Sequence, residues 1–227
     1  MDRIYTGIGS RETPPDVLAE MRALGKALAA AGFTLRSGGA DGADAAFEAG
    51  AREISGAALE IYLPWPGFNN NPSRLVGVGP RALELAAAIH PAWQRLGPGP
   101  RKLHGRNCYQ VLGRRLDRPS QFVACWTPDG CESERERSTR TGGTATAIVL
   151  ASRHGIPVFN LARPGRRAAL LEFLAELGVI IPRATFDEAR TPRSPSTESR
   201  VERSSPPSFD RRGVGGLRET GVRWKCQ

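Results

Sequence analysis

The chain has 227 residues, of which 40% are hydrophobic and 24% are charged, and its formal net charge is +9. This length and composition suit one globular α/β domain with an additional segment. No apolar run reaches the roughly 18 residues that a membrane span needs, and a strand pattern follows Met1-Asp2-Arg3 directly, so we expect neither membrane association nor a signal peptide. Four cysteines without a C-x-x-C pair favour reduced thiols and a cytoplasmic location over a disulfide framework or structural zinc.

Part of the positive charge is concentrated in one stretch. Residues 93–118 contain seven cationic residues and a single acidic residue, Asp117. Such a run is either the solvated face of a helix or a contact surface for an anionic partner, phosphate or nucleic acid. The sequence leaves both interpretations open.

Hydrophobic periodicity and turn residues predict strands that alternate with helices. A first strand at 3–8 runs into Gly7-Ile8-Gly9, and a helix begins at Thr13-Pro14-Pro15-Asp16, where proline suits the first helical positions, and ends at Gly32. The later expected elements are a strand at 33–36, a helix at 43–52, a strand at 58–63, a loop at 64–72, a helix at 81–96, a break at 97–100, a helix at 102–116, a strand at 121–126, a charged loop at 128–140, a helix at 143–154, a strand at 157–160 and a helix at 164–177. This alternation predicts a Rossmann-like, doubly wound α/β fold with a mostly parallel sheet of five or more strands and helices on both faces.

The character of the sequence changes after about Pro182. Apolar periodicity stops there, and Ser, Pro, Arg and Glu dominate to the last residue. Such a segment cannot bury enough apolar surface to offset the entropy of ordering it. We therefore expect a folded domain at 1–182 and a disordered tail at 183–227.

Three glycine-rich segments each follow an expected strand. They are Gly7-Ile8-Gly9-Ser10-Arg11, Ser37-Gly38-Gly39-Ala40-Asp41-Gly42-Ala43-Asp44 and Thr141-Gly142-Gly143-Thr144-Ala145-Thr146-Ala147. Glycine lets the backbone approach an anion closely, and the free amides of a helix N-terminus point at it. Because clefts in open α/β sheets lie outside the carboxyl ends of the strands, we expect residues 7–11, 37–44 and 142–146 to meet at one ligand cleft.

The order of these motifs, with His104-Gly105-Arg106-Asn107 before the last, resembles the nucleotide-binding domain of the DprA/Smf group. That group belongs to a Rossmann-like superfamily, SLOG, which also contains the lonely guy phosphoribohydrolases, and the resemblance spans about residues 3–161. It implies nucleotide or single-stranded DNA as ligand, a role in DNA processing or recombination with a recombinase as partner, and a fold that commonly self-associates. The ligand- or phosphate-binding residues that it implies are Gly7, Gly9, Ser10, Arg11, Ser37, Gly38, Gly39, Asp41, Asp44, Arg106, Asn107, Gly142, Gly143, Thr144 and Thr146.

The resemblance breaks down at the residue that matters for catalysis. Lonely guy enzymes carry Pro-Gly-Gly-x-Gly-Thr and a catalytic glutamate two residues after the threonine, and alignment on Gly142-Gly143 places Ala145 at the third glycine and Ile148 at the glutamate. Isoleucine cannot transfer protons. We therefore expect no catalytic residue, no metal and no cofactor, and favour a protein that binds a phosphorylated nucleoside or nucleic acid.

Two alternatives to simple binding stay open. One is a nucleotide N-glycosidic hydrolase in which Asp41, Asp44 or an acidic residue of 132–136 replaces the missing glutamate. The other is a sensor that binds a nucleotide signal without turnover. The two aspartates could also simply cap the helix that they begin.

Four further residues have two interpretations each. Arg106 is expected to hold phosphate with little effect on stability, or to be a surface arginine. His104 is a local hydrogen-bonding histidine or a general base. Trp65 and Phe68 either cover the core or stack on a base.

Overall fold

The computed structural model describes residues 3–186, which form a six-stranded, entirely parallel sheet in the order β4-β3-β2-β1-β5-β6. Near the start of β1, Tyr5 lies opposite Leu35 of β2 on one side and Phe122 of β5 on the other. The strands are β1 (Ile4–Gly9), β2 (Thr34–Ser37), β3 (Leu59–Leu63), β4 (Leu75–Val76), β5 (Phe122–Trp126) and β6 (Val158–Asn160). The expected Rossmann-like, doubly wound α/β fold is confirmed.

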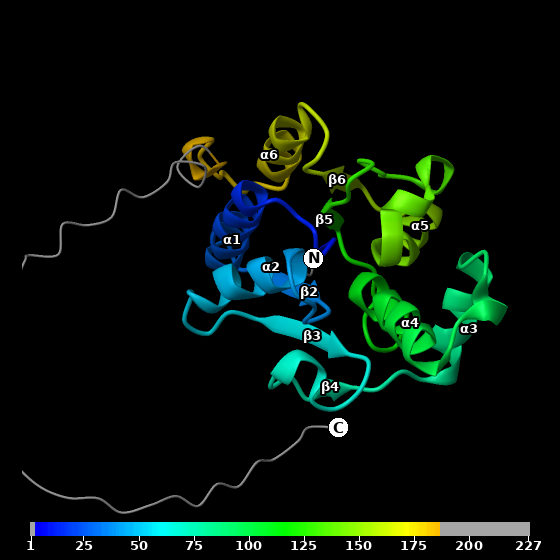
Figure 1. Cartoon of the computed structure of the whole chain (residues 1–227). Coiled ribbons are helices and arrows are strands. Elements are labelled where there is room, and N and C mark those ends of the chain that lie inside the picture. The colour runs from blue at the N-terminus through cyan, green and yellow to red at the C-terminus, as the bar shows by residue number, and fades with distance from the viewer. Residues whose placement is uncertain (1–2, 187–227) are drawn as a thin grey trace, which may run out of the picture. The chain divides into compact units, whose positions relative to one another are not determined.

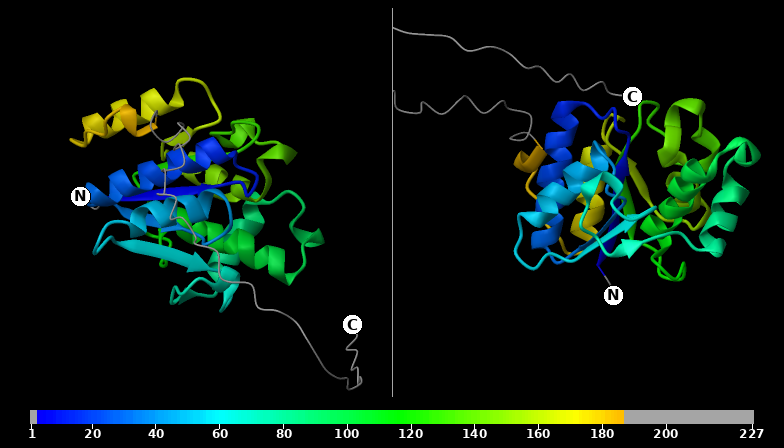
Figure 2. Two further views of the ribbon diagram at one scale, coloured as in Figure 1. Left: turned by 60° about the vertical axis from the view of Figure 1, so that its left-hand side comes forward. Right: turned by 60° about the horizontal axis from the view of Figure 1, so that its bottom comes forward.

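Helices cover both faces of this sheet (Figure 1). One face carries α1 (Pro15–Ala30), α2 (Ala43–Arg52) and α6 (Arg166–Glu176), and the other carries α3 (Pro80–Ile89), α4 (Pro98–Leu112) and α5 (Ala145–Arg153). The turned views in Figure 2 show the same two groups of helices on either side of the strands. Short 3₁₀ turns at Phe68–Asn70, Trp93–Arg95, Glu134–Glu136 and Thr139–Thr144 complete the connections.

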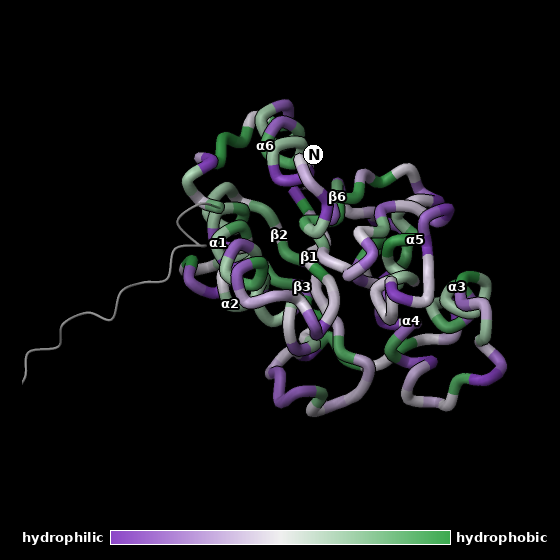
Figure 3. The backbone as a smooth tube through the Cα atoms, turned by 45° about the horizontal axis from the view of Figure 1, so that its top comes forward, coloured by the Kyte–Doolittle hydropathy of each residue, from purple (hydrophilic) through white to green (hydrophobic). Residues whose placement is uncertain are grey.

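Two hydrophobic cores, one on each face, hold the layers together. The first is rich in aromatic rings: Tyr5 stacks on Phe122 with ring centroids 5.6 Å apart, and Phe33 and Phe47 meet Tyr5 edge-on. The second is aliphatic and joins α3, α4 and α5 to the sheet. In Figure 3 green, hydrophobic segments run along β2 and β3, whereas the purple segments lie mainly on outer loops and turns.

Helices α1 and α2 pack very closely because each presents a glycine to the other. A Cβ at Gly25 would lie 2.6 Å from the carbonyl oxygen of Phe47, and a Cβ at Gly50 would lie 1.9 Å from the carbonyl oxygen of Arg22. Both obstacles are backbone atoms, which cannot move aside without separating the helices. The close contact therefore depends on these two glycines.

We expect Gly50→Ala to destabilise the protein, although alanine is the better helix former. Relieving the clash with Arg22 costs about 1–3 kcal/mol, which exceeds the roughly 1 kcal/mol gained in helix propensity. Thermal unfolding followed by circular dichroism should show a lower Tm. Ala49→Ser on the exposed side of α2 is the control, and an unchanged Tm for Gly50→Ala would contradict the close packing.

The structure corrects the expected boundaries around α4. Residues 97–100 do not break a helix but begin one: Gly97 is the extended N-cap residue and Pro98 occupies the first turn, where its missing N–H costs nothing. The helix ends at Leu112 because Gly113 adopts φ 74°. The predicted helix 102–116 was therefore placed too late in the chain.

Other corrections are smaller. The predicted helix 81–96 ends at Ile89, because a residue that precedes proline, here His90, disfavours helical backbone, and only a 3₁₀ turn follows. The segment 128–140, expected as loop, contains 3₁₀ turns, and β4, two residues long, was missed within 64–80. Phe186 is buried in the first core, so the folded part extends beyond 182; the rest of the expected tail, from 187 on, lies outside the described residues.

The basic stretch 93–118 is divided by this arrangement. Helix α4 has 15 residues, about 22 Å of axial length, so Arg101 lies near one end and Arg115 lies just beyond the other. Arg114 does not continue the helix but donates hydrogen bonds to the carbonyls of Val76 and Gly77. The stretch is therefore not one continuous cationic face.

In residues 3–186 no helix has the length and apolar character needed to cross a membrane. Cys108, Cys125 and Cys131 are buried as free thiols, and burial raises the pKa of Cys108 to about 12. Cys226 lies outside the described residues.

Candidate functional site

A cleft of about 640 Å³ opens at the carboxyl ends of β1 and β5. The chain leads from β1 to β2 on one side of β1, and β5 pairs with β1 on its other side. The cleft therefore lies where the strand order reverses. Ligands in open α/β sheets characteristically bind at this switch point. The lining residues are Ile8, Gly9, Ser10, Arg11, Glu12, Ala40, Asp44, Pro100, Leu103, His104, Arg106, Asn107, Gln110, Pro128, Thr139, Arg140, Thr141, Gly142, Gly143 and Thr144.

The three glycine-rich segments do meet at this cleft, as expected. Of the predicted site residues, the ones that line it are Gly9, Ser10, Arg11, Asp44, Arg106, Asn107, Gly142, Gly143 and Thr144. The remaining ones are not part of the lining: Gly7, Ser37, Gly38, Gly39, Asp41 and Thr146. The segments therefore supply part of the wall and also residues outside it.

Predicted site residues that do not line the cleft shape the loop after β2. Ser37 donates a hydrogen bond from Oγ to the carbonyl of Gly7, at 2.7 Å, which ties the ends of β2 and β1 together. Gly39 adopts φ 61°, a conformation that glycine tolerates. Asp41 is exposed at the following turn, and Gly42, not an aspartate, is the N-cap residue of α2.

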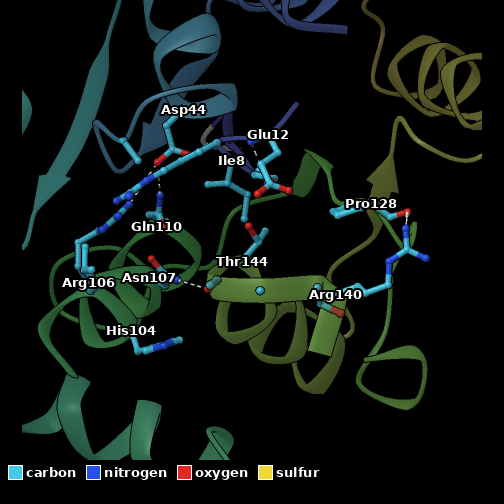
Figure 4. A pocket seen from close by; sticks show the side chains of 18 of the residues that line it. Ile8, Glu12, Asp44, His104, Arg106, Asn107, Gln110, Pro128, Arg140 and Thr144 are labelled. Atoms are coloured by element: carbon cyan, nitrogen blue, oxygen red, sulfur yellow. Dashed lines mark hydrogen bonds and ion pairs between the residues drawn. The ribbon is translucent and has the colours of Figure 1, made fainter. Parts of the chain in front are cut away.

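A buried ion pair lies at the centre of the cleft wall. Arg106 NH1 is 3.2 Å from Asp44 Oδ2, and the two side chains are only 6% and 5% exposed. The same carboxylate oxygen accepts from the backbone N–H of Gly38 at 3.1 Å. Figure 4 shows Arg106 reaching across from α4 toward Asp44 of α2, so the pair links the two layers of helices through the end of the sheet.

This geometry corrects the expected role of Arg106. Burial raises the pKa of Asp44 and lowers the pKa of Arg106, and their mutual attraction only partly offsets both shifts. The alternative of a surface arginine is wrong, because Arg106 is buried and its charge is paired with Asp44 inside the protein. Arg106 is therefore a structural element of the cleft wall, and a contact of this residue with phosphate stays a prediction.

Two polar neighbours on α4 extend the wall. Asn107 donates from Nδ2 to the carbonyl of Gly143 at 2.8 Å (Figure 4). In the orientation that satisfies its amide, Gln110 accepts from Gly38 N–H and from Arg106, each at 2.9 Å, and donates to Asn107. Side chains of α4 therefore form hydrogen bonds with both the loop after β2 and the loop before α5.

The loop before α5 presents backbone to the cleft. Gly142 and Gly143 are exposed, and Gly142 adopts φ 62° and ψ −149°, which glycine tolerates and side chains disfavour. The N-terminus of α5 follows immediately, with its amides and the positive end of its dipole. This part of the wall has the character of an anion site.

Two exposed arginines complete the positive side of the cleft. Arg11 follows β1, and Arg140 precedes the glycine loop, where it donates to the carbonyl of Pro128 at 3.5 Å. Within residues 3–186 neither has a carboxylate at ion-pair distance, unlike Arg106. Their charge is available to an anion, while Glu12 adds one negative charge to the lining.

His104 lines the cleft as a neutral side chain. Burial, together with the nearby His90 and Arg106, lowers the pKa of His104 to about 4. Its Nδ1 lies 2.7 Å from Thr146 Oγ1, and its ring is 4.5 Å from the His90 ring. Both interpretations of this residue, local hydrogen bonding and proton transfer, are compatible with a neutral imidazole.

The acidic residues of 132–136 do not line the cleft, against the hydrolase alternative built on them. Glu132 is buried and bonds Asn160 N–H and Arg166, whereas Glu134 pairs with Arg153. Ile148 is fully buried in the second core, so its position faces the sheet and not the cleft.

The aromatic pair after β3 does not line the cleft either. Trp65 and Phe68 pack against each other edge-on with ring centroids 5.3 Å apart, and Phe68 also lies under Arg106. The core-covering interpretation is therefore the one that the structure supports.

Sequence reasoning missed several lining residues: Glu12, Gln110, Arg140 and Thr141. Gln110 had a signal, since it stands four residues after Arg106 and so on the same helical face. Arg140 directly precedes the glycine loop, but it lies in a stretch of exposed charges that is indistinguishable from solvated loop.

The described residues 3–186 hold no group of three or more His, Cys, Asp or Glu side chains arranged for a metal ion. Comparisons with protein-family models, with curated proteins and with solved structures find no match. The DprA-like assignment therefore stays a hypothesis from motif order.

Proposed function

We propose that the cleft binds the phosphate of a nucleotide and that the protein is a DprA-like nucleotide- or nucleic-acid-binding protein. The observation that carries this proposal is the combination of the exposed Gly142-Gly143 backbone at the start of α5 with two arginines, Arg11 and Arg140, that lack carboxylate partners among the described residues. Helix amides and unpaired guanidinium groups together favour a dianionic ligand.

The dimensions of the cleft favour a mononucleotide as the first ligand to test. Its volume of about 640 Å³ falls within the range typical of small-molecule sites. The apolar side chains Ile8, Pro100 and Leu103 offer a surface for a base or sugar, and the neutral His104 offers a hydrogen bond. The divided basic stretch 93–118 argues against a long electrostatic track along α4.

Arg11→Ala and Arg140→Ala should each weaken nucleotide binding on the order of tenfold, because each removes one charge-assisted contact. Stability should change little, because both side chains are exposed. The measurement is isothermal titration calorimetry with the four nucleoside 5′-monophosphates and, in parallel, fluorescence anisotropy with labelled oligothymidylate.

The matched control is Arg115→Ala, an 84% exposed arginine beyond the far end of α4. Equal losses of affinity in Arg115→Ala and the two cleft variants would show that diffuse surface charge, and not a specific site in the cleft, attracts the nucleotide. A wild-type protein that binds none of the monophosphates and no oligothymidylate would contradict the proposal outright.

Single-stranded DNA is the second candidate ligand, and one feature favours it. Arg101 lies over the ring of Trp93, 5.6 Å from its centroid, and the flanking residues Pro100 and Leu103 line the cleft. Trp93 itself does not line the cleft and packs on the second core, but its ring is partly exposed near the cleft entrance residues, and partly exposed aromatic rings with arginines are typical of surfaces on which bases stack. A steep salt dependence of oligothymidylate binding, lost in Trp93→Ala, would favour DNA over the free nucleotide.

A further inference from the structure

The glycine loop of the cleft is held by a carboxylate that does not itself line the cleft. Asp129 stands in the turn after β5, and its Oδ2 accepts from Ser138 Oγ at 2.6 Å and from Thr141 Oγ1 at 2.5 Å. Thr141 is buried, and Gly142 follows it directly. One oxygen atom thus anchors both ends of the segment that leads into the exposed glycines.

The two hydroxyl groups are fully committed by these contacts. Ser138 Oγ also accepts from Arg140 N–H at 3.1 Å, and Thr141 Oγ1 also accepts from Ser138 N–H at 3.0 Å, so the two residues form a capping box. An ionised carboxylate can only accept, which forces both hydroxyl protons toward Asp129 and leaves the lone pairs facing the backbone amides. The charge on Asp129 therefore sets the direction of the hydrogen bonds that these two hydroxyl groups make.

The turn that carries Asp129 is itself fixed to the sheet. Asn160, at the end of β6, donates from Nδ2 to Thr127 Oγ1 and to the carbonyl of Cys131, and its Oδ1 accepts from Thr127 N–H. Asp129 lies between these two anchored residues. From the other side, Asn107 holds the carbonyl of Gly143. The glycine loop is therefore fixed from two sides: by β6 through the turn that carries Asp129, and by α4 through Asn107.

We propose that Asp129 is a positioning residue for the anion site: through the Ser138 and Thr141 hydroxyl groups it holds the Gly142-Gly143 backbone in the conformation that binds phosphate. This inference rests on the proposed function of the cleft and adds a residue that the motif resemblance does not include. Burial raises the pKa of Asp129, but the hydrogen bonds from Ser138, Thr141, Thr127 and the Cys131 backbone together outweigh it and lower the pKa, so the carboxylate is charged at neutral pH.

The test compares two replacements of Thr141 that differ in one group. Thr141→Val keeps the shape and removes the hydroxyl, and should weaken binding of AMP about fivefold to tenfold through loss of the linking hydrogen bonds. Thr141→Ser keeps the hydroxyl and should bind AMP more tightly than Thr141→Val does, because the link to Asp129 is retained. Asp129→Asn should act in the same direction as Thr141→Val: both carboxylate oxygens accept, Oδ2 from the two hydroxyl groups and Oδ1 from Cys131 N–H at 3.4 Å, so the amide must turn an N–H group toward a donor. The double variant should lose no more than Thr141→Val alone, because both changes break the same link.

A second measurement detects positioning directly. Amide hydrogen exchange across Ser138–Thr144 should be faster in Asp129→Asn and Thr141→Val than in the wild type, while exchange in β1 and β5 stays unchanged. Glu134→Gln is the matched control, since this carboxylate belongs to the same connection but pairs with Arg153. It should alter neither affinity nor exchange.

The outcomes separate the two hypotheses. Wild-type protein that binds no nucleotide overturns both the proposed function and this inference. Wild-type protein that binds AMP, with Thr141→Val equally tight or Thr141→Ser equally weakened, overturns the positioning role alone. If Asp129→Asn fails to fold, the two Thr141 variants still decide the question.

Discussion

Arg106→Ala should lower the free energy of unfolding by about 3–5 kcal/mol, the cost of removing one member of a buried ion pair. Asp44 would stay buried without its charged partner. Loss of the Arg106 side chain, which lies over Phe68, would also leave a cavity. Chemical denaturation at neutral pH measures the effect. The variant should also bind nucleotide poorly, because the wall of the cleft is built on this pair.

The pH dependence of that loss provides an internal check. The pKa of Asp44 is already raised by burial, and removal of Arg106 takes away the interactions that oppose the rise. An acid whose folded-state pKa is raised binds a proton in the folded state first, so stability increases as pH falls from above the folded pKa toward the unfolded value. The deficit of Arg106→Ala should therefore shrink at acid pH. A deficit independent of pH, or below about 1.4 kcal/mol, one tenfold step in equilibrium constant, would contradict the buried-pair interpretation.

Gly38→Ala should have a comparable effect, although it replaces the smallest side chain by the next smallest. A Cβ at this position would lie 1.1 Å from Arg106 NH1 and 2.6 Å from the side-chain amide group of Gln110. The guanidinium would have to leave its place, and Asp44 would then lose its partner without any change to the arginine itself. We expect a loss of about 3 kcal/mol in the free energy of unfolding.

A double-mutant cycle tests whether the two changes act through the same contact. In Gly38→Ala with Arg106→Ala, the methyl group enters space that the arginine no longer fills, so the combined loss should be close to that of Arg106→Ala alone. Simple addition of the two losses would show that Gly38 is required for a different reason, such as the backbone of the loop. Gly143→Ala, where a Cβ meets nothing within 4 Å, is the control for an added methyl group in the cleft region.

The strands and helices were predictable where local pattern and tertiary structure agree. Helix α2 has the predicted bounds, because its apolar residues recur at helical spacing between Gly42 and the end of the run. Helix α4 was misplaced because Gly97-Pro98-Gly99-Pro100 has the composition of a turn, and only the geometry of the first helical turn makes prolines acceptable there. Strand β4 has two residues and thus no periodicity to detect.

The cleft was predictable in position but not in its electrostatics. Glycine after each strand indicated where a ligand would approach, since parallel strands end at one edge. The pairing of Arg106 with Asp44, 62 positions apart, had no local signal, and it is the reason that the proposed function relies on Arg11 and Arg140. In the sequence Asp129 is one of many charged residues in a polar loop. Its partners are two hydroxyl groups, and only the folded chain brings them to the carboxylate.

The strand order has a consequence for how the molecule is made. Strands β1 to β4 are neighbours both along the chain and in the sheet, so this half can assemble early during synthesis, with the far edge of β1 still unpaired. That edge waits for β5, whose residue Phe122 pairs with Tyr5 from the other end of a long intervening segment. Domains with such distant contacts fold slowly and expose strand edges meanwhile. The cleft therefore comes into being only as the nascent chain completes β5 and α5, and an arrested or truncated product would carry its first two glycine loops without any binding site.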